Sequence, residues 1–104
     1  MSETAYTVHF PDYFDAEEWD VVEKGWTHVV EIRAGANRFR PTFYDPNRLA
    51  QTIACSLASE SHYYAEPNIV VIEVVDRAHI TAAIGQIANR GFEGLTPVAG
   101  SPRS

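Results

Sequence analysis

The sequence lacks most of the features that would place a small protein in a chemical or cellular class at once. Its 104 residues include one cysteine, Cys55, so no internal disulfide can form. No uncharged apolar run approaches the roughly 20 residues that cross a bilayer, and the first residues, MSETAY, lack the basic and apolar regions of a secretion signal. We therefore expect a cytoplasmic protein that does not enter a membrane.

The motifs of common cofactor and metal sites are also missing. The six glycines match neither a phosphate-binding loop nor a dinucleotide fingerprint. The four histidines stand alone in their segments, and no CxxC or HxxxH pair is present, so we predict no metal site and no cofactor. Cys55 is expected in the middle of a helix, which is typical of a structural cysteine rather than a nucleophile.

Basic residues are few and dispersed, whereas acidic residues are concentrated. Eight Lys and Arg against fourteen Asp and Glu give a net charge of −6. Without a basic cluster to displace counterions from phosphates, duplex nucleic acid is a poor candidate partner. Six of the fourteen acids fall in the stretch FPDYFDAEEWDVVE, residues 10–23, together with four aromatic residues. The remainder of the chain is nearly neutral.

The overall composition is that of an ordinary globular domain. Apolar residues make up 45% of the chain and charged residues 21%, both near the averages for folded proteins. A chain of this length can bury a hydrophobic core without a disulfide or a metal. We expect one domain over residues 1–98 and a flexible tail over residues 99–104.

The first half of the chain predicts strands around one short helix. Apolar and polar residues alternate over residues 5–10, over Trp26–Arg33 and over Arg38–Tyr44, and the last two form a hairpin through the turn AGAN. Pro41 lacks an N–H group, so the second hairpin strand is expected at a sheet edge or with this position facing solvent. In Trp26–Arg33, His28 is expected on the same face as Val30 and Ile32.

The acidic stretch itself predicts a helix over Ala16–Lys24. Asp15 is a candidate N-cap, Gly25 follows the helix, and Trp19 and Val22 are three residues apart and would form its packed side. A rival interpretation makes residues 19–22 a strand that turns through residues 23–25.

The second half predicts helices alternating with a strand. Asp45 and Pro46 begin a helix that extends to about Ser59, and Asp76 begins another over Arg77–Arg90, with Gly91 at its end. The β-branched run Ile69–Val75 is typical of a central strand buried on both faces, and residues 92–98 are a candidate final strand.

This order of elements predicts the α+β class. We expect a two-layer sandwich, in which two main helices cover one face of a mixed β-sheet of about four or five strands. If the strands over residues 38–44 and 69–75 share that sheet, they are parallel and joined by a right-handed crossover.

Glu73 and His28 are the candidate residues for an enzyme or a small-ligand binder. A carboxylate within IVVIEVV would be buried on a central strand, and His28 would lie among apolar residues of its own strand. If both face the same side, they form an acid–base pair in a pocket, with the aromatic loop HYY nearby. The structural alternative is that Glu73 faces solvent and pairs with Arg38 or Arg40.

The leading interpretation is a non-enzymatic interaction protein. Acidic residues accelerate the encounter with a basic partner, and Tyr13, Phe14 and Trp19 are the candidate apolar anchors of the interface. The predicted partner-binding residues are Asp12, Tyr13, Phe14, Asp15, Glu17, Glu18 and Asp20.

Self-association is a second expectation. The two later helices carry no charge over residues 51–59 and 80–89, and Thr81, Gly85 and Asn89 form a row of small residues away from the isoleucines. This row could receive a second copy of the chain. The alternative is a monomer whose helices are merely rich in Ala and Ser.

Overall fold

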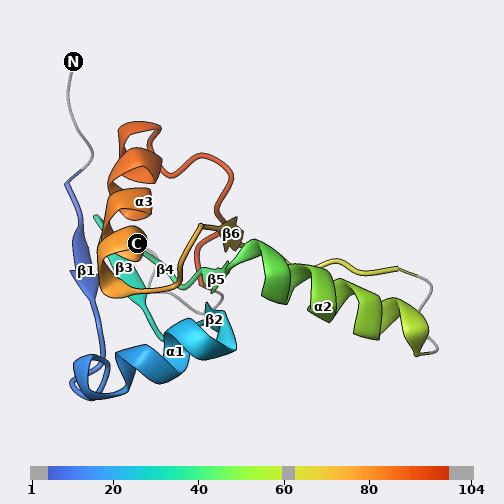
Figure 1. Cartoon of the computed structure of the whole chain (residues 1–104). Coiled ribbons are helices and arrows are strands. Elements are labelled where there is room, and N and C mark those ends of the chain that lie inside the picture. Colours follow the sequence, from blue (N-terminus) through green and yellow to red (C-terminus); the bar gives the residue numbers. More distant parts are fainter. Residues whose placement is uncertain (1–4, 60–62, 99–104) are drawn as a thin grey trace.

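The computed structural model describes residues 5–59 and 63–98, which fold into two small β-sheets and three α-helices (Figure 1). The helical segments are a 3-10 turn η1 (Asp15–Glu17), α1 (Glu18–Lys24), α2 (Pro46–Ala58) and α3 (Arg77–Asn89). The strands are β1 (Thr7–His9), β2 (Trp26–Thr27), β3 (Glu31–Ala34), β4 (Asn37–Phe39), β5 (Thr42–Tyr44) and β6 (Ile69–Val71). The predicted α+β class is confirmed.

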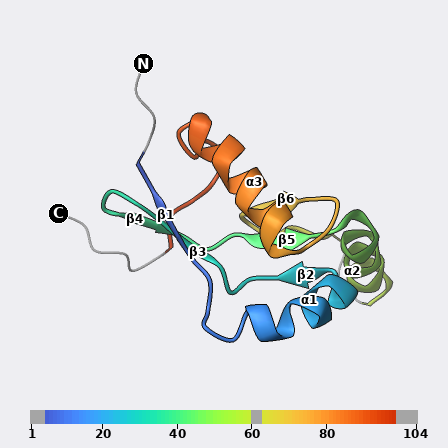
Figure 2. The same cartoon turned by 60° about the vertical axis from the view of Figure 1, so that its left-hand side comes forward.

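Two three-stranded sheets replace the expected mixed sheet of four or five strands. Their strand orders are β1-β3-β4 and β2-β5-β6. The expected hairpin over residues 26–44 supplies strands to both sheets: β3 pairs with β4, and β2 pairs with β5, antiparallel in each case. Of the two main helices expected on one face, only α3 buries residues in the core, since α2 has no buried residue. The short helix α1 lies on the opposite side of β2 and β5 from α3 (Figure 2).

Pro41 lies where the hairpin changes sheet. Residues 40–41 separate β4 from β5, and residues 28–30 separate β2 from β3 on the other arm. A proline cannot donate the hydrogen bond that would continue the ladder. The expected strand is at a sheet edge only in part: β4 is an edge strand of its sheet, whereas β5 is the central strand of the other. The alternative that Pro41 faces solvent is wrong, since its side chain is fully buried at the bend.

The same interruption shifts the side-chain alternation by one residue. Thr27 is buried opposite Phe43, but the next buried apolar residues toward the turn are Val30 and Ile32, so the inward side changes from an odd position to even ones. His28 falls at the shift and faces solvent. The prediction that it shares an apolar face with Val30 and Ile32 is therefore wrong.

The parallel pairing predicted for the second half is confirmed. Thr42 pairs with Ile69, and Tyr44 with Val71, with α2 in the connection between the two strands. The strand predicted over Ile69–Val75 is shorter in the structure, because β6 ends at Val71. This strand is only partly buried, so the prediction that both of its faces are buried is wrong. Residues 92–98 form a turn rather than a strand, although the Val98 N–H donates to the Arg38 carbonyl at 2.7 Å.

The boundaries of α2 and α3 agree closely with those predicted from local sequence. The predicted N-cap Asp15 is wrong, because α1 begins at Glu18 after the 3-10 turn and has no side-chain cap. Asp45 caps α2 by accepting from the Arg48 N–H at 2.7 Å, and Asp76 caps α3 by accepting from the His79 N–H at 2.8 Å. Gly25 ends α1 in the left-handed region, with φ of 79°. The acidic stretch is thus helical over Glu18–Lys24, and the rival strand is not formed.

The core lies between α3 and the strands. Ile80, Ile84 and Ala88 of α3 belong to one cluster with apolar residues of both sheets, with Phe14 before η1 and with Val21 of α1. The buried residues of this cluster are Phe14, Val21, Val30, Ile32, Ala34, Phe39, Phe43, Val75, Ile80, Ile84, Ala88 and Phe92. In contrast, α2 contributes no buried residue and extends away from the body (Figure 1). None of the helices among the described residues is long and apolar enough to cross a membrane. The expected tail, residues 99–104, lies outside the described residues.

Candidate functional site

The outer side of α1 carries an exposed tryptophan. The spacing of Trp19 and Val22 predicted that they form the packed side of this helix, and this prediction is wrong: Trp19 is 64% exposed and Val22 36%. The residue of α1 that enters the core is Val21. Because residues three and four apart share one side of a helix, Trp19, Val22 and Glu23 lie together on the solvent side.

The two aromatic residues before η1 divide between surface and core. Tyr13 is 54% exposed, and its role as an interface anchor stays a prediction. Phe14 is 1% exposed, so its prediction as a partner-binding residue is wrong. Its ring lies 4.9 Å from that of Phe10, centroid to centroid, and it joins η1 to the core.

Two of the predicted partner-binding acids are engaged within the fold. The Arg77 side chain donates from Nε to Asp15 Oδ1 at 2.9 Å, and the Arg77 backbone N–H donates to Glu18 Oε2 at 2.7 Å. The guanidinium group also stands 4.1 Å from the centre of the Phe10 ring. Asp15 and Glu18 therefore hold the acidic segment against the start of α3.

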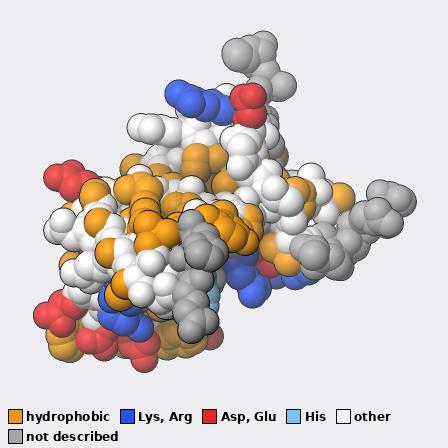
Figure 3. All heavy atoms as spheres, turned by 90° about the vertical axis from the view of Figure 1, so that its right-hand side faces the viewer, with side chains coloured by type: hydrophobic (Ala, Val, Ile, Leu, Met, Phe, Trp, Pro, Cys, Tyr) orange, Lys and Arg blue, Asp and Glu red, His pale blue; other side chains and the backbone are white. Residues whose placement is uncertain are grey.

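The other acids of the segment remain on the surface. Asp12, Glu17, Asp20 and Glu23 are exposed, and their side chains make no hydrogen bond or ion pair with the rest of the described chain. Acidic side chains gather along the lower edge of the molecule in Figure 3, at the height of α1 in Figure 1. We call the exposed set Asp12, Tyr13, Glu17, Trp19, Asp20, Val22 and Glu23 the α1 surface.

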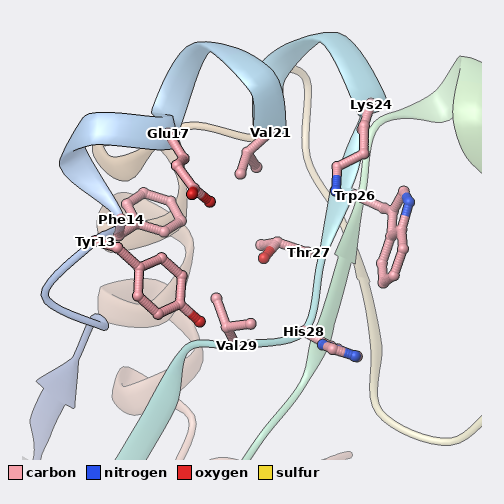
Figure 4. Close-up of a pocket in the computed structure, with 9 residues that line it drawn as sticks. All are labelled: Tyr13, Phe14, Glu17, Val21, Lys24, Trp26, Thr27, His28 and Val29. Carbon is pink, nitrogen blue, oxygen red and sulfur yellow. The ribbon is translucent and has the colours of Figure 1, made fainter.

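A pocket lies between α1 and the chain that leaves β2. It has a volume of about 220 Å³, and its lining comes from η1 and α1 on one side and from residues 26–29 on the other. Figure 4 shows Val21 and the Glu17 carboxylate projecting from the helical side, and Thr27 and Val29 from the opposite side. The Tyr13 ring closes a third side. The pocket is formed at the site where the hairpin changes sheet.

A second hollow continues from this pocket. It shares Tyr13, His28 and Val29 with the first, and it extends to Arg40 and Thr42 on the second arm of the hairpin. The hollow is wider and more open to solvent. His28 thus lies at a junction of two hollows, although it faces solvent rather than a closed acid–base site.

Glu73 does not occupy the position expected of a catalytic acid. It lies beyond the end of β6 in a bend and is exposed, so the prediction of a buried carboxylate on a central strand is wrong. The structural alternative, pairing with Arg38 or Arg40, is not observed among the described residues. The glutamate that interacts electrostatically with His28 is Glu66.

Glu66 is held by two tyrosine hydroxyl groups beside β5. Tyr44 donates to Glu66 Oε1 at 2.9 Å, and Tyr64 donates to the same oxygen. Burial raises the pKa of Glu66, but the hydrogen bonds from Tyr64 and Tyr44, together with contributions from Thr42 and His28, lower it by more and hold this pKa below its usual value. Burial and the hydrogen bond to this carboxylate raise the pKa of Tyr64. The cluster fastens residues 64–66 to the sheet.

Three arginines that are dispersed in the sequence gather around one carboxylate. Arg33 and Arg38, which are directly paired across β3 and β4, each donate to Glu31 at 3.2 Å. Burial raises the pKa of Glu31, but these two arginines together with Arg40 lower it by more. Arg38 and Arg40 are therefore neighbours of Glu31 rather than of Glu73.

The row predicted for self-association is only partly open. Thr81 and Asn89 are exposed, but Gly85 is half-buried, and a Cβ atom at this position would stand 3.8 Å from the Tyr6 hydroxyl. The open apolar surface lies instead on α2, where Ala50, Ala54 and Leu57 are exposed and follow one another at helical spacing. Cys55 is also exposed on α2.

Two further searches, for metal-binding clusters and for similar proteins, give no indication of an activity. Among residues 5–59 and 63–98, no group of three or more His, Cys, Asp or Glu is placed to hold a metal ion. Comparisons with protein-family models, with curated proteins and with solved structures find no match. The geometry of the α1 surface and of the pocket beneath it is therefore the basis for assigning a function.

Proposed function

We propose that this protein is a small, non-enzymatic, cytoplasmic interaction protein that binds a basic surface of another protein through the α1 surface. An inhibitor, an immunity-type protein and a regulatory partner all belong to this class. The proposal rests on the described geometry and charge of residues 10–23.

The observation that carries the proposal is the exposure of Trp19. A side chain of this size leaves a large apolar area in water when it is 64% exposed. Tryptophan and tyrosine are enriched among the residues that contribute most to protein interfaces, and Tyr13 is exposed on the same segment. Contact with a partner would remove both rings from water.

The charge around Trp19 supports a basic partner. Asp20 and Glu23 flank it on α1, and Asp12 and Glu17 precede it, all exposed and without partners in the described chain. Complementary charge raises the rate of encounter and disfavours acidic partners. Since Asp15 and Glu18 already bind Arg77, these four acids supply the recognition charge.

The test is a selection from a library of displayed random peptides against the immobilised full chain, with the Trp19→Ala variant as the counter-target. We expect enriched peptides to combine Lys or Arg with apolar residues. Their affinity should fall by roughly 30-fold in Trp19→Ala, the equivalent of about 2 kcal/mol at a central interface residue. Enrichment of acidic or neutral peptides, or binding indifferent to Trp19, would contradict the proposal.

The dependence of peptide affinity on salt concentration is an independent test of the same interaction. Binding through the α1 surface should weaken steeply as salt rises to about 0.5 M, because the Debye length then falls well below 10 Å. The Asp20→Asn and Glu23→Gln double variant should bind more weakly and lose much of this salt dependence. The control is Glu93→Gln, an exposed acid outside the α1 surface.

Self-association through α2 is a second candidate function, favoured by the exposure of Leu57. This leucine is 49% exposed and continues the side of α2 that carries Ala50 and Ala54. Residues 49–59 carry no charge, so two copies can approach along α2 without the repulsion that a net charge of −6 causes elsewhere. We propose α2, rather than the row at Thr81 and Gly85, as the contact between copies.

A further inference from the structure

We infer that the pocket beneath α1 receives one basic side chain, Lys or Arg, from the bound partner, and that Glu17 recognises its charge. This inference rests on the proposed function, because it assigns a role in partner binding to a pocket that adjoins the α1 surface. Tyr13 and Glu17 belong to both the surface and the pocket. A partner lying on α1 therefore has a cavity beside its contact area.

The volume of the pocket suits a single side chain. Sites for drug-sized ligands occupy about 300–1,000 Å³. The pocket measures about 220 Å³, which is below this range. A pocket of this size is small for a free ligand, but it can hold one long, narrow side chain of a bound partner.

The walls of the pocket match the two parts of a basic side chain. Val21 and Val29 face one another across the pocket and offer an apolar contact for an aliphatic stem (Figure 4). The Glu17 carboxylate projects into the same space and offers a charged acceptor for the head group. The Tyr13 ring supplies a cation–π surface beside it.

Glu17 has no cation of its own. Its side chain makes no hydrogen bond or ion pair within the described part of the chain. Lys24 also lines the pocket, but its Nζ atom stands 5.8 Å from the centre of the Trp26 ring. Figure 4 shows the Lys24 amine turned toward the strand of Trp26. The carboxylate is therefore left for an incoming cation.

The direct test uses N-acetyl-arginine amide as a probe of the pocket. Amide resonances of the isotope-labelled full chain are followed by NMR as the probe is added. Saturable shifts are expected for Val21, Thr27 and Val29, with millimolar affinity for so small a ligand. N-acetyl-citrulline amide, which keeps the shape and lacks the charge, should produce no saturable shift at these positions.

Substitution of Glu17 tests the source of recognition. Glu17→Gln should weaken binding of the arginine probe roughly tenfold, because the charge-assisted hydrogen bond is lost. Glu93→Gln removes the same charge from a distant exposed position and should leave the affinity within about twofold. Equal binding of arginine and citrulline, unchanged affinity in Glu17→Gln, or no saturable shift at the pocket would overturn the inference.

The peptides selected on the full chain separate this inference from the proposed function. Basic peptides that depend on Trp19 but bind equally well to Glu17→Gln would retain the proposed function and exclude the pocket. If the arginine probe binds with dependence on Glu17 while no basic peptide is selected, the pocket assignment holds and the proposed function fails. Replacing each Arg of a selected peptide by citrulline identifies the residue that enters the pocket.

Discussion

The Arg77 backbone N–H donates a 2.7 Å hydrogen bond to Glu18 Oε2, so an acid from the middle of the acidic stretch contacts the first turn of α3. The first N–H groups of a helix have no partner within that helix. Glu18 satisfies one of them and brings a negative charge to the positive end of the helix. The acidic stretch is consequently part of the packing of the fold as well as of its surface.

Replacing Glu18 should lower the stability of the fold more than replacing an acidic residue whose side chain has no partner. We expect Glu18→Ala to lower the free energy of unfolding by about 1 kcal/mol, because the hydrogen bond to the Arg77 N–H is lost. Glu23→Gln, on the solvent side of the same helix, should remain within about 0.5 kcal/mol of the original protein. Urea denaturation of the two variants provides the measurement, and equal stabilities would contradict the role assigned to Glu18.

The contact of Glu18 with α3 determines which acidic residues can be replaced in a test of partner binding. Neutralising Glu17, Glu18 and Asp20 together would combine loss of surface charge with loosening of α1 from α3. Variants of Asp12, Glu17, Asp20 and Glu23 avoid the second effect, since their side chains have no partner among the described residues.

Phe14 and Trp19 should respond in opposite ways to truncation. Phe14 is fully buried, so Phe14→Ala should cost about 3–5 kcal/mol of unfolding free energy and can prevent folding. Trp19→Ala should change stability by less than about 0.5 kcal/mol, because most of the ring is already in water. Thermal denaturation compares the two. A large loss of stability in Trp19→Ala would mean that its ring packs against the protein in solution.

Features set by neighbouring residues were predicted well from the sequence. Asp45 and Asp76 begin helices because a short acidic side chain accepts from an N–H three residues ahead, a relationship that local sequence contains in full. Gly25 and Gly91 end helices with φ of 79° and 67°, a conformation for which glycine is the preferred residue. These four residues placed the starts of α2 and α3 and the ends of α1 and α3, whereas the start of α1 was not predicted correctly.

Features set by tertiary contacts were not predicted. The alternation of Trp26–Arg33 gives no sign that Pro41, on the opposite arm, breaks the ladder and shifts the pattern at His28. The pocket forms at this break, so Thr27 and Val29 were not recognised as its lining. Likewise, Glu66 was not identified, because its tyrosine partners come from β5 and from the loop that returns beside α2.

The short acidic helix was predicted with the wrong side packed. Trp19 and Val22 fit helical spacing, but a helix of this length contributes only Val21 to the core. The hydrophobicity of Trp19 favoured an inward orientation. In the structure, the contact of Glu18 with Arg77 and the burial of Phe14 orient α1 so that Trp19 faces solvent. Four residues of the predicted site, Asp12, Tyr13, Glu17 and Asp20, are exposed, and their role in partner binding stays a prediction.

Self-association through α2 predicts a specific pattern of variants. The original chain should form dimers at high concentration, and Leu57→Lys should shift it to monomer by placing two charges at the contact between copies. Gln51→Lys adds the same charge at an exposed position on another side of α2 and should leave the dimer intact. Light scattering over a range of concentrations measures the mass. A monomeric original chain, or equal effects of the two variants, would exclude this contact.

Acid should destabilise the protein through three carboxylates whose partners lower their pKa values. Burial raises the pKa of Glu31, Glu66 and Asp76, but the arginines, the tyrosines and His79 respectively lower each pKa by more. A carboxylate with a lower pKa in the folded state contributes stability above its unfolded value, and this contribution is lost as the pH falls through the folded value. The reference values are 4.5 for Glu31 and Glu66 and 3.8 for Asp76.

The contribution of these groups should therefore be constant from neutral pH to about pH 5 and decline below pH 4.5. Glu66→Gln should lower stability at neutral pH and flatten the decline in acid, because the substituted side chain no longer takes up a proton on unfolding. Urea midpoints measured from pH 7 to about pH 3 test both parts. An acid decline as steep in Glu66→Gln as in the original protein would show that the Tyr44–Tyr64–Glu66 cluster does not control the pKa of this carboxylate.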